Sequence, residues 1–254
     1  MPASSAQLRA TAFTHQGAVR PTSEDTIAVG DWVMSAPMAA PKTFELAVTR
    51  PVLCLVADGM GGHAAGEVAS RAVAEHLAAH AGGAINEAAL ADLLGEANAE
   101  LLERMQARPL LAGMGTTVAG AVVGPANNLV FNVGDSRVYR LEAGGLEQLS
   151  TDDTPGPKLT DGRSAAITSH LITQTLGGAY EAIAIEPHLL ALPPATRERY
   201  LICSDGLSDL VPRAALEDCL GEDDSASVRA LFEAAMAAGG PDNVSIVMLD
   251  VRRA

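Results

Sequence analysis

The stretch "VLCLVADGMGGHAAGE", from Val52 to Glu67, joins a run of apolar residues to an aspartate and then to a glycine-rich turn. The apolar run has the length and β-branched content of a buried strand. The residues that follow Glu67, "VASRAVAEHLAAH", are typical of a helix. An aspartate between such elements either starts a turn or serves a chemical purpose, and the rest of the chain decides between these interpretations.

Composition narrows the classes of protein that the chain can represent. It has 254 residues, of which 48% are hydrophobic and 3% aromatic, so Val, Leu, Ile and Ala must form the core. The excess of 31 acidic over 17 basic residues argues against a partner that is a nucleic acid or an anionic membrane. No segment approaches the ~20 apolar residues that cross a bilayer, and the first residues lack the apolar core of a signal peptide. We expect a cytoplasmic protein.

Three cysteines, Cys54, Cys203 and Cys219, are far apart and form no CxxC motif. Two of them lie inside apolar runs, so we expect reduced thiols that act as small hydrophobic side chains.

Short strand-like runs dominate the chain, and helices separate the groups of strands. The predicted strands are "TIAVGDWVM", "VLCLVAD", "TTVAGAVV", "NLVFNVGD", "SRVYRLE", "RYLICSD" and "NVSIVMLDV". Helices are predicted from about Glu67, over "INEAALADLLGEANAELLERMQ", and near Ala214–Leu220 and Ala226–Ala237. The loops "SAPMAAPKT" and "TPGPKLTDGRS" are expected on the surface. This order favours antiparallel sheets with helices packed outside, in a single domain over residues 1–254.

Aspartates mark the ends of several predicted strands. Asp58, Asp135 and Asp205 end apolar runs, and Asp242 precedes one. The end of one antiparallel strand and the start of its neighbour lie at the same edge of a sheet, so we expect the four to gather at one edge. Each pair ~5 Å apart would repel by roughly 3 kcal/mol at an effective dielectric near 20. All six pairs then oppose a total stability of only ~5–15 kcal/mol.

Such a cluster must protonate, spread apart or bind cations. A single aspartate at a strand end is best interpreted as turn chemistry. For four, three of them in the tripeptides "ADG", "GDS" and "SDG", a metal site is favoured. All-oxygen ligands suit Mg²⁺ or Mn²⁺ rather than zinc.

Two rival sites are weaker. The string "GMGGHA" fits a dinucleotide-binding pattern, but Asp58 would repel a pyrophosphate and no acidic residue ends a second strand about 20 residues on. His76 and His80 have the four-residue spacing of a two-histidine metal site. The flanking "EHLAAH" does not place a glutamate after the first histidine, so we expect two surface histidines on an amphipathic helix.

Six motifs in order resemble the metal-dependent protein phosphatases of type 2C, and most closely their compact bacterial branch. They are "GAVRPTSED", "VADGMGGHAAGE", "MGTT", "NVGDSRVYRL", "CSDGLSD" and "GGPDNVSIVML", and they span about residues 13–250. The resemblance implies an α+β fold with four layers, an α-β-β-α sandwich of two central antiparallel sheets flanked by helices. It also implies a metal centre in a cleft at one end.

The resemblance assigns residues to this centre. Two divalent ions, Mn²⁺ or Mg²⁺, would be bridged by Asp58, with the Gly59 carbonyl on one ion and Asp205 and Asp242 on the other. Asp25 would act directly or through water.

Further residues are implied around it. Glu24 would also act directly or through water, Asp135 would bind a third, weaker ion together with Asp205, and Asp209 would assist. Arg20 would grip the phosphate, for which its planar fork of donors is suited. Without its place five residues before Asp25, Arg20 would be interpreted as an exposed surface charge.

The implied function is hydrolysis of phosphoserine and phosphothreonine in proteins by a metal-activated water, reversing Ser/Thr kinases without a phosphoenzyme intermediate. The implied partners are phosphorylated proteins, and the implied state is a monomer. A catalytically silent protein that binds phosphoproteins is the alternative, and a nucleotide-dependent oxidoreductase is a third hypothesis. Glycines next to the ligands would let the backbone approach the ions.

Some positions depart from the family pattern. Ser23 stands where an asparagine is usual, which predicts a local loss of hydrogen bonding. Met60 stands where eukaryotic relatives carry a histidine proposed as general acid, and the nearby His63 is expected to be structural. Asp152 and Asp153 stand close to where the family has "DHS". The segment 150–176 resembles a shortened flap beside the cleft.

Overall fold

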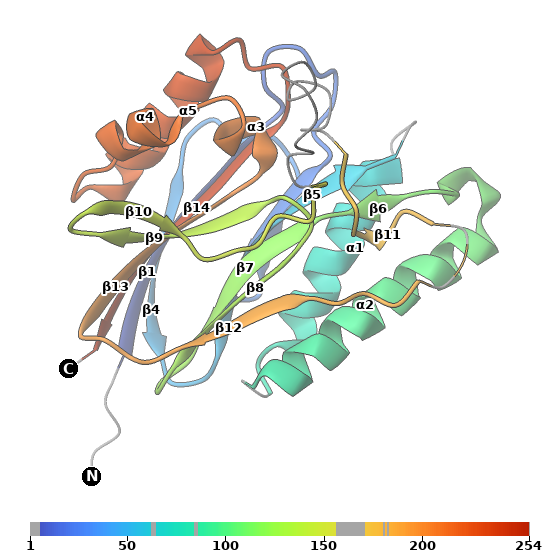
Figure 1. Ribbon diagram of the computed structural model, residues 1–254, viewed down its shortest axis with the longest axis horizontal. Coiled ribbons are helices and arrows are strands. Elements are labelled where there is room, and N and C mark those ends of the chain that lie inside the picture. The colour runs from blue at the N-terminus through green and yellow to red at the C-terminus, as the bar shows by residue number, and fades with distance from the viewer. Residues whose placement is uncertain are drawn as a thin grey trace.

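Two antiparallel sheets stack face to face and carry helices on both outer faces (Figure 1). The computed structural model describes residues 6–61, 65–83, 86–155, 171–179, 181 and 183–253. The layers follow the order helices, sheet, sheet, helices, with a hydrophobic cluster in each of the three spaces between them. The predicted α+β four-layer sandwich is confirmed, whereas the single domain over residues 1–254 stays a prediction.

The first sheet has six strands. In sheet order they are β10 (Gly145–Gln148), β9 (Arg137–Glu142), β13 (Arg197–Cys203), β14 (Val244–Arg253), β1 (Ala6–His15) and β4 (Lys42–Val48). Strands β1 and β14 pair along their full lengths, from Ala6 opposite Arg253 to His15 opposite Val244. The sequence did not predict β1, because its inward side is built largely from alanines, which carry little strand signal.

The second sheet has eight strands. They are β11 (Leu176–Gly177), β6 (Gly115–Thr116), β5 (Val52–Met60), β7 (Val118–Val123), β8 (Asn128–Val133) and β12 (His188–Leu192), with β2 (Asp25–Val29) and β3 (Trp32–Met34) beside β5. The single predicted strand "TIAVGDWVM" is wrong, because the chain reverses between β2 and β3 at Gly30, which has a φ of 57°. The strands β4, β10, β11 and β12 were also not predicted, and β4 begins inside the predicted loop "SAPMAAPKT".

Helices cover the two outer faces. The eight-stranded sheet carries α1 (Ala65–His80) and α2 (Glu87–Ala107), followed by the 3-10 turn η1 (Pro109–Leu111). The six-stranded sheet carries α3 (Asp205–Ser208), α4 (Arg213–Asp218) and α5 (Asp224–Ala237), at the opposite side of Figure 1. Side chains cap two of these helices, since Asn86 accepts from the Ala89 amide at 2.8 Å and Asp223 accepts from the first turn of α5. No helix in the described residues is long and apolar enough to cross a membrane.

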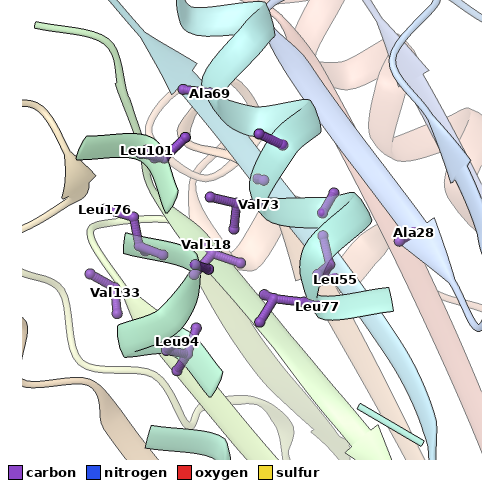
Figure 2. Packing of buried hydrophobic residues seen from close by; sticks show 14 of the residues in the cluster. Ala28, Leu55, Ala69, Val73, Leu77, Leu94, Leu101, Val118, Val133 and Leu176 are labelled. Carbon is purple, nitrogen blue, oxygen red and sulfur yellow. The ribbon is translucent and has the colours of Figure 1, made fainter. Parts of the chain in front are cut away.

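The apolar run of β5 is buried on both faces. Leu53, Leu55 and Ala57 pack towards α1 and α2, and Figure 2 shows Leu55 beside Val73 and Leu77. The intervening Cys54 and Val56 pack between the two sheets. Side chains alternate across a strand, so a continuous apolar run is what a strand with two covered faces requires. Cys54 and Cys203 are buried free thiols, as expected, whereas Cys219 is partly exposed.

Candidate metal centre

Two aspartates lie opposite each other on β2 and β5. The register of this pair places Asp25 directly across from Asp58. Both are on the strand faces that carry Ile27 and Val56, which pack between the two sheets. The two carboxyl groups therefore lie at the end of the core between the sheets.

The six-stranded sheet supplies two more aspartates. Strand β13 ends at Cys203, opposite Ile246 of β14, so the chain leaves β13 where it enters β14. Asp205 begins α3 just after β13, and Asp242 lies two residues before β14. A Cβ on Gly206 would lie 1.9 Å from the Asn243 carbonyl oxygen, so only glycine allows these two segments to lie this close.

The four aspartates gather, but not at one edge of one sheet. Asp58 comes from the eight-stranded sheet, Asp205 and Asp242 adjoin strands of the six-stranded sheet, and Asp135 lies in the connection from β8 of the former to β9 of the latter. The charges of Asp205 and Asp242 act on Asp58, and the charge of Asp205 acts on Asp135. The expectation of a single edge was wrong, because strand ends reveal neighbours within a sheet and not the stacking of two sheets.

Burial and crowding perturb the central pair. Burial, followed by the charges of Asp25 and Asp205, raises the pKa of Asp58 well above its ordinary range. Burial also raises the pKa of Asp205. Asp58 and Asp205 lie close enough for their carboxyl groups to share a proton when no cation neutralises them. This arrangement holds more negative charge than its protein surroundings compensate.

The pKa values of Asp25 and Asp135 are raised in the same way. Burial raises the pKa of Asp25 to about 7, although hydrogen bonds from Ser245 and Ser204 oppose the shift. The Ser204 hydroxyl donates to Asp25 Oδ2 at 3.0 Å. Burial, followed by the charge of Asp205, raises the pKa of Asp135 to about 7. Sequence reasoning missed the two serines, although Ser204 stands next to Asp205 in "CSDGLSD".

The donor set fits a hard divalent cation. Among the described residues, Asp25 Oδ1 and Asp205 Oδ1 are buried carboxylate oxygens without a hydrogen-bond partner. Such atoms are costly unless something satisfies them. No three acidic, histidine or cysteine side chains of the described ranges are arranged closely enough to hold an ion as they stand. The Asp205 side chain interacts with Asp58, and the Asp242 side chain pairs with Arg20. The candidate side-chain ligands are all carboxylates, so they offer only oxygen atoms, which Mn²⁺ and Mg²⁺ prefer.

Arg20 lies beside this centre. Its Nη2 donates to Asp242 Oδ2 at 2.7 Å, and half of its side chain is exposed. It is therefore neither a free surface charge nor buried. An arginine that is ion-paired and solvent-accessible can exchange its carboxylate for another oxyanion.

Glu24 is held close to the aspartates by its backbone. Its amide donates to Asn243 Oδ1 at 2.8 Å, and burial raises the pKa of its side chain. The neighbouring Ser23 is buried, and its hydroxyl has no partner among the described residues. The predicted loss of hydrogen bonding at Ser23 is thus present. Asn243, which the sequence reasoning missed, ties this loop to the start of β14.

The glycines at positions 59 and 66 allow neighbouring backbone segments to lie in close contact. A Cβ on Gly59 would lie 2.2 Å from the Gly66 carbonyl oxygen and 2.5 Å from that of Glu24. A Cβ on Gly66 would lie 2.9 Å from the Glu24 carboxyl carbon. The last residues of β5, the first turn of α1 and the Glu24 loop therefore meet in direct contact around the aspartates.

Asp209 lies beside the centre but is engaged elsewhere. Arg137 Nη2 is 3.0 Å from Asp209 Oδ1 and 2.7 Å from Asp152 Oδ2. Asp209 still contributes charge to Asp135 and Asp205. Arg137 was not singled out from the sequence, although it follows Asp135 by two positions in "GDSR".

The other residues and segments singled out from the sequence have different outcomes. Met60 is at the surface, with 37% of it exposed. His63 lies outside the described residues, as does most of the predicted flap, residues 156–170. The expectation that His76 and His80 are both surface histidines is wrong for His76. Its side chain is only 15% exposed and lies 2.9 Å from Glu100, because α2 packs over that side of α1.

The sequence matches a family model and known proteins. The model described as "Protein phosphatase 2C" matches residues 43–244. The "Serine/threonine protein phosphatase PstP" of Mycobacterium tuberculosis (strain ATCC 25618 / H37Rv) is 35% identical over 96% of this chain. The chain spans 45% of the length of that relative. The "Serine/threonine phosphatase stp" of Listeria welshimeri is 30% identical, with 82% of this chain and 87% of the relative covered.

A solved structure is similar over nearly the whole chain. The catalytic domain of PstP, crystallised in complex with two manganese ions, superimposes with a TM-score of 0.79. It is 35% identical, and the match covers 97% of this chain and 99% of that one.

Proposed function

The chain belongs to the protein phosphatase 2C family, and from this premise we propose that it hydrolyses phosphoserine and phosphothreonine in proteins with the help of two divalent cations. One observation carries the proposal. Carboxyl groups from both sheets converge on one point and leave two buried oxygens, of Asp25 and Asp205, without a partner among the described residues. A half-exposed arginine, Arg20, stands beside them.

We assign the cations to this cluster. Asp58, the Gly59 carbonyl, Asp205 and Asp242 would hold the two cations. The two manganese ions of the PstP structure and the all-oxygen donor set support Mn²⁺, and the donor set alone extends this to Mg²⁺. When bound, such cations supply positive charge to the phosphate and lower the pKa of a coordinated water.

Other residues complete the assignment. Asp25 and Glu24 support the ligands directly or through water, because they lie against Asp58 and Gly59. Asp135, with Asp205, is proposed to hold a third and weaker ion. Asp209 assists less than the sequence predicted, because Arg137 already occupies one of its oxygens.

Arg20 orients the substrate. In the present arrangement its guanidinium neutralises Asp242. The planar fork of Arg20 matches two oxygens of a phosphate, and it would be available to them if Asp242 held a cation instead. Met60 carries no proton to donate, so no side chain at that position protonates the leaving group.

The proposed substrates are phosphorylated proteins, with Ser/Thr kinases or their targets as partners, in the cytoplasm and with the chain as a monomer. The named activities of the bacterial relatives support the substrate class. The net charge of −14 supports proteins rather than nucleic acid as partners.

A phosphothreonine peptide tests this function. Release of phosphate is measured with Mn²⁺ alone and with excess chelator, on protein freed of metal beforehand. We expect turnover with Mn²⁺ and none with chelator. Equal rates in both conditions would contradict metal dependence. Tight peptide binding without turnover in Mn²⁺ would instead favour the catalytically silent phosphoprotein-binding alternative.

A further inference from the structure

Two pairs of side chains face each other where α1 and α2 pack. His76 and His80 lie one turn apart on α1, and Glu96 and Glu100 lie one turn apart on α2. Residues four apart share a helix face, so each helix presents its pair as a unit. His76 contacts both glutamates, with Nδ1 2.9 Å from Glu100 Oε2 and Nε2 3.8 Å from Glu96 Oε2.

The hydrogen bonds define which ring nitrogens are free. His76 Nδ1 contacts a carboxylate, and His80 Nδ1 lies 2.8 Å from the His76 carbonyl oxygen. Both partners can only accept, so each Nδ1 must donate. In a neutral imidazole with a proton on Nδ1, the lone pair is on Nε2. Both histidines therefore present Nε2 as a metal-ligating atom.

The Nε2 atom of His76 is buried and lacks a hydrogen-bond partner among the described residues. The rings of His76 and His80 lie with centroids 4.7 Å apart. A buried nitrogen lone pair without a donor is unusual, because most buried polar atoms are satisfied. The structure thus places two imidazoles side by side and leaves the inner one unsatisfied.

A cavity of about 280 Å³ opens beside this cluster. Polar side chains of His80, Asp92 and Glu96 contribute to its wall, and apolar residues such as Leu90 and Val122 complete it. The Glu96 side chain is 66% exposed, so it can rotate towards the imidazoles without disturbing the core.

The described side chains do not enclose an ion as they stand. We propose that, once Glu96 rotates towards the imidazoles, His76, His80 and Glu96 bind a divalent transition metal ion of the Zn²⁺ and Cu²⁺ class at this α1–α2 site. Two imidazole nitrogens and one carboxylate are a donor set that such ions favour, whereas Mg²⁺ and Mn²⁺ favour oxygen alone. Glu100 orients His76 through Nδ1, the role that carboxylates commonly have behind a metal-bound histidine. The fourth position is left to solvent.

This site is separate from the carboxylate centre. Gly66, at the start of α1, touches that centre, and His76 lies ten residues further along the helix, or ~15 Å at 1.5 Å per residue. An ion here would clamp α1 to α2 at the far end of the helix from the aspartates. The proposal does not depend on phosphatase activity.

Copper binding observed by electron paramagnetic resonance tests it. The full chain is freed of metal, saturated with Mg²⁺ and titrated with Cu²⁺, whose spectrum shows splitting from bound nitrogen. We expect the first equivalent to show splitting from two imidazoles. His80→Ala should reduce the number of coordinated imidazoles seen in the spectrum to one or none, and it should weaken copper binding at least tenfold. Glu100→Gln should weaken binding by about ten- to a hundredfold, as changes behind a ligand do.

Matched controls separate this site from other histidines. His188 Nε2 lies 3.0 Å from Asp153 Oδ1, a single histidine–carboxylate pair, and His188→Gln should leave the spectrum unchanged. Asp58→Asn should also leave it unchanged, and circular dichroism checks that each variant is folded. The proposal is overturned if the wild-type signal contains only one nitrogen, or if it survives His80→Ala in a folded protein.

Discussion

At the scale of single residues, the centre is defined by carboxyl groups whose charges the protein does not compensate. The pKa of Asp58 is raised by burial and by its neighbours, and Asp205 keeps a buried oxygen unpaired among the described residues. Hydrogen bonds from nearby serines and amides lower the raised carboxyl pKa values only in part, as the pKa of Asp25 near 7 indicates. Side chains under such strain are the ones on which substitutions should separate activity from stability.

Replacing Asp58 by asparagine should abolish turnover while the fold persists. The change removes a proposed ligand of the cations, and the loss of several kcal/mol of transition-state stabilisation corresponds to a rate lower by about 10³-fold or more. Stability should not fall, because one member of a repelling group becomes neutral. Phosphate release and thermal unfolding measure the two effects. Wild-type turnover in the Asp58→Asn variant would remove this residue from the centre.

Replacing Arg20 by lysine should lower kcat/KM for a phosphothreonine peptide. A charge-assisted hydrogen bond is worth about 1.5–3 kcal/mol, so the loss of the second donor predicts a decrease of about ten- to a hundredfold. The matched control is Arg50→Lys, because Arg50 also pairs with an aspartate, Asp31, but is exposed on another part of the surface. Equal kinetics for both variants would contradict the assigned role of Arg20.

At the scale of elements, close contact between backbones positions the ligands. The end of β5, the start of α1 and the Glu24 loop meet at Gly59 and Gly66, where side chains have no room. Gly206 likewise allows α3 and the start of β14 to lie in close contact. Gly59 and Gly66 thus allow the close packing of backbone beside the candidate centre.

Gly59→Ala should destabilise the protein. Its Cβ would fall 2.2 Å from the Gly66 carbonyl oxygen, and such overpacking costs about 1–3 kcal/mol or more of the free energy of unfolding. Gly95→Ala is the matched control, because nothing lies within 4 Å of its Cβ in the middle of α2. Alanine is favoured there by about 1 kcal/mol, so that variant should be more stable. Urea unfolding compares them, and a neutral Gly59→Ala would refute the contact.

The end of β14 provides a pH-dependent ion pair far from the centre. Burial alone would raise the pKa of Asp250, but hydrogen bonds from Arg252 and Arg197 lower it to about 2. A lowered carboxyl pKa adds stability above about pH 4, and this is lost as the pH falls from about 4 to 2. Asp250→Asn should therefore be less stable than wild type at pH 7, and the gap should close on acidification. Unfolding by urea across this range measures it, and a gap independent of pH would contradict the ion pair.

At the scale of the whole molecule, the stacking of two sheets creates the site. The sandwich of two sheets followed from the family resemblance, whereas the strand pattern predicted layers of antiparallel sheet and most helices, because alternation and apolar runs reflect burial locally. It did not reveal which strand ends meet, since Asp58 and Asp205 belong to different sheets whose packing depends on the entire inner faces. Nor could it reveal β1, whose alanines carry little signal, or the burial of His76, which depends on α2.

Candidate ligands could be named from the sequence more fully than the residues that surround them. Asp58, Asp205 and Asp242 stand in motifs whose residue order survives in the sequence, so the resemblance identified them as candidates. Ser204, which hydrogen-bonds Asp25, acts through a tertiary contact that the spacing of residues in the sequence does not reveal. The ion pair between Arg137 and Asp209 could not be predicted for the same reason.

The most direct measurement of the central idea is anomalous diffraction from a crystal of this protein soaked in manganese. We predict two strong peaks enclosed by the carboxylates of Asp58, Asp205 and Asp242, with Arg20 released from Asp242. Peaks only at other places on the surface, with Arg20 still bound to Asp242 and the four aspartates free of metal, would contradict it.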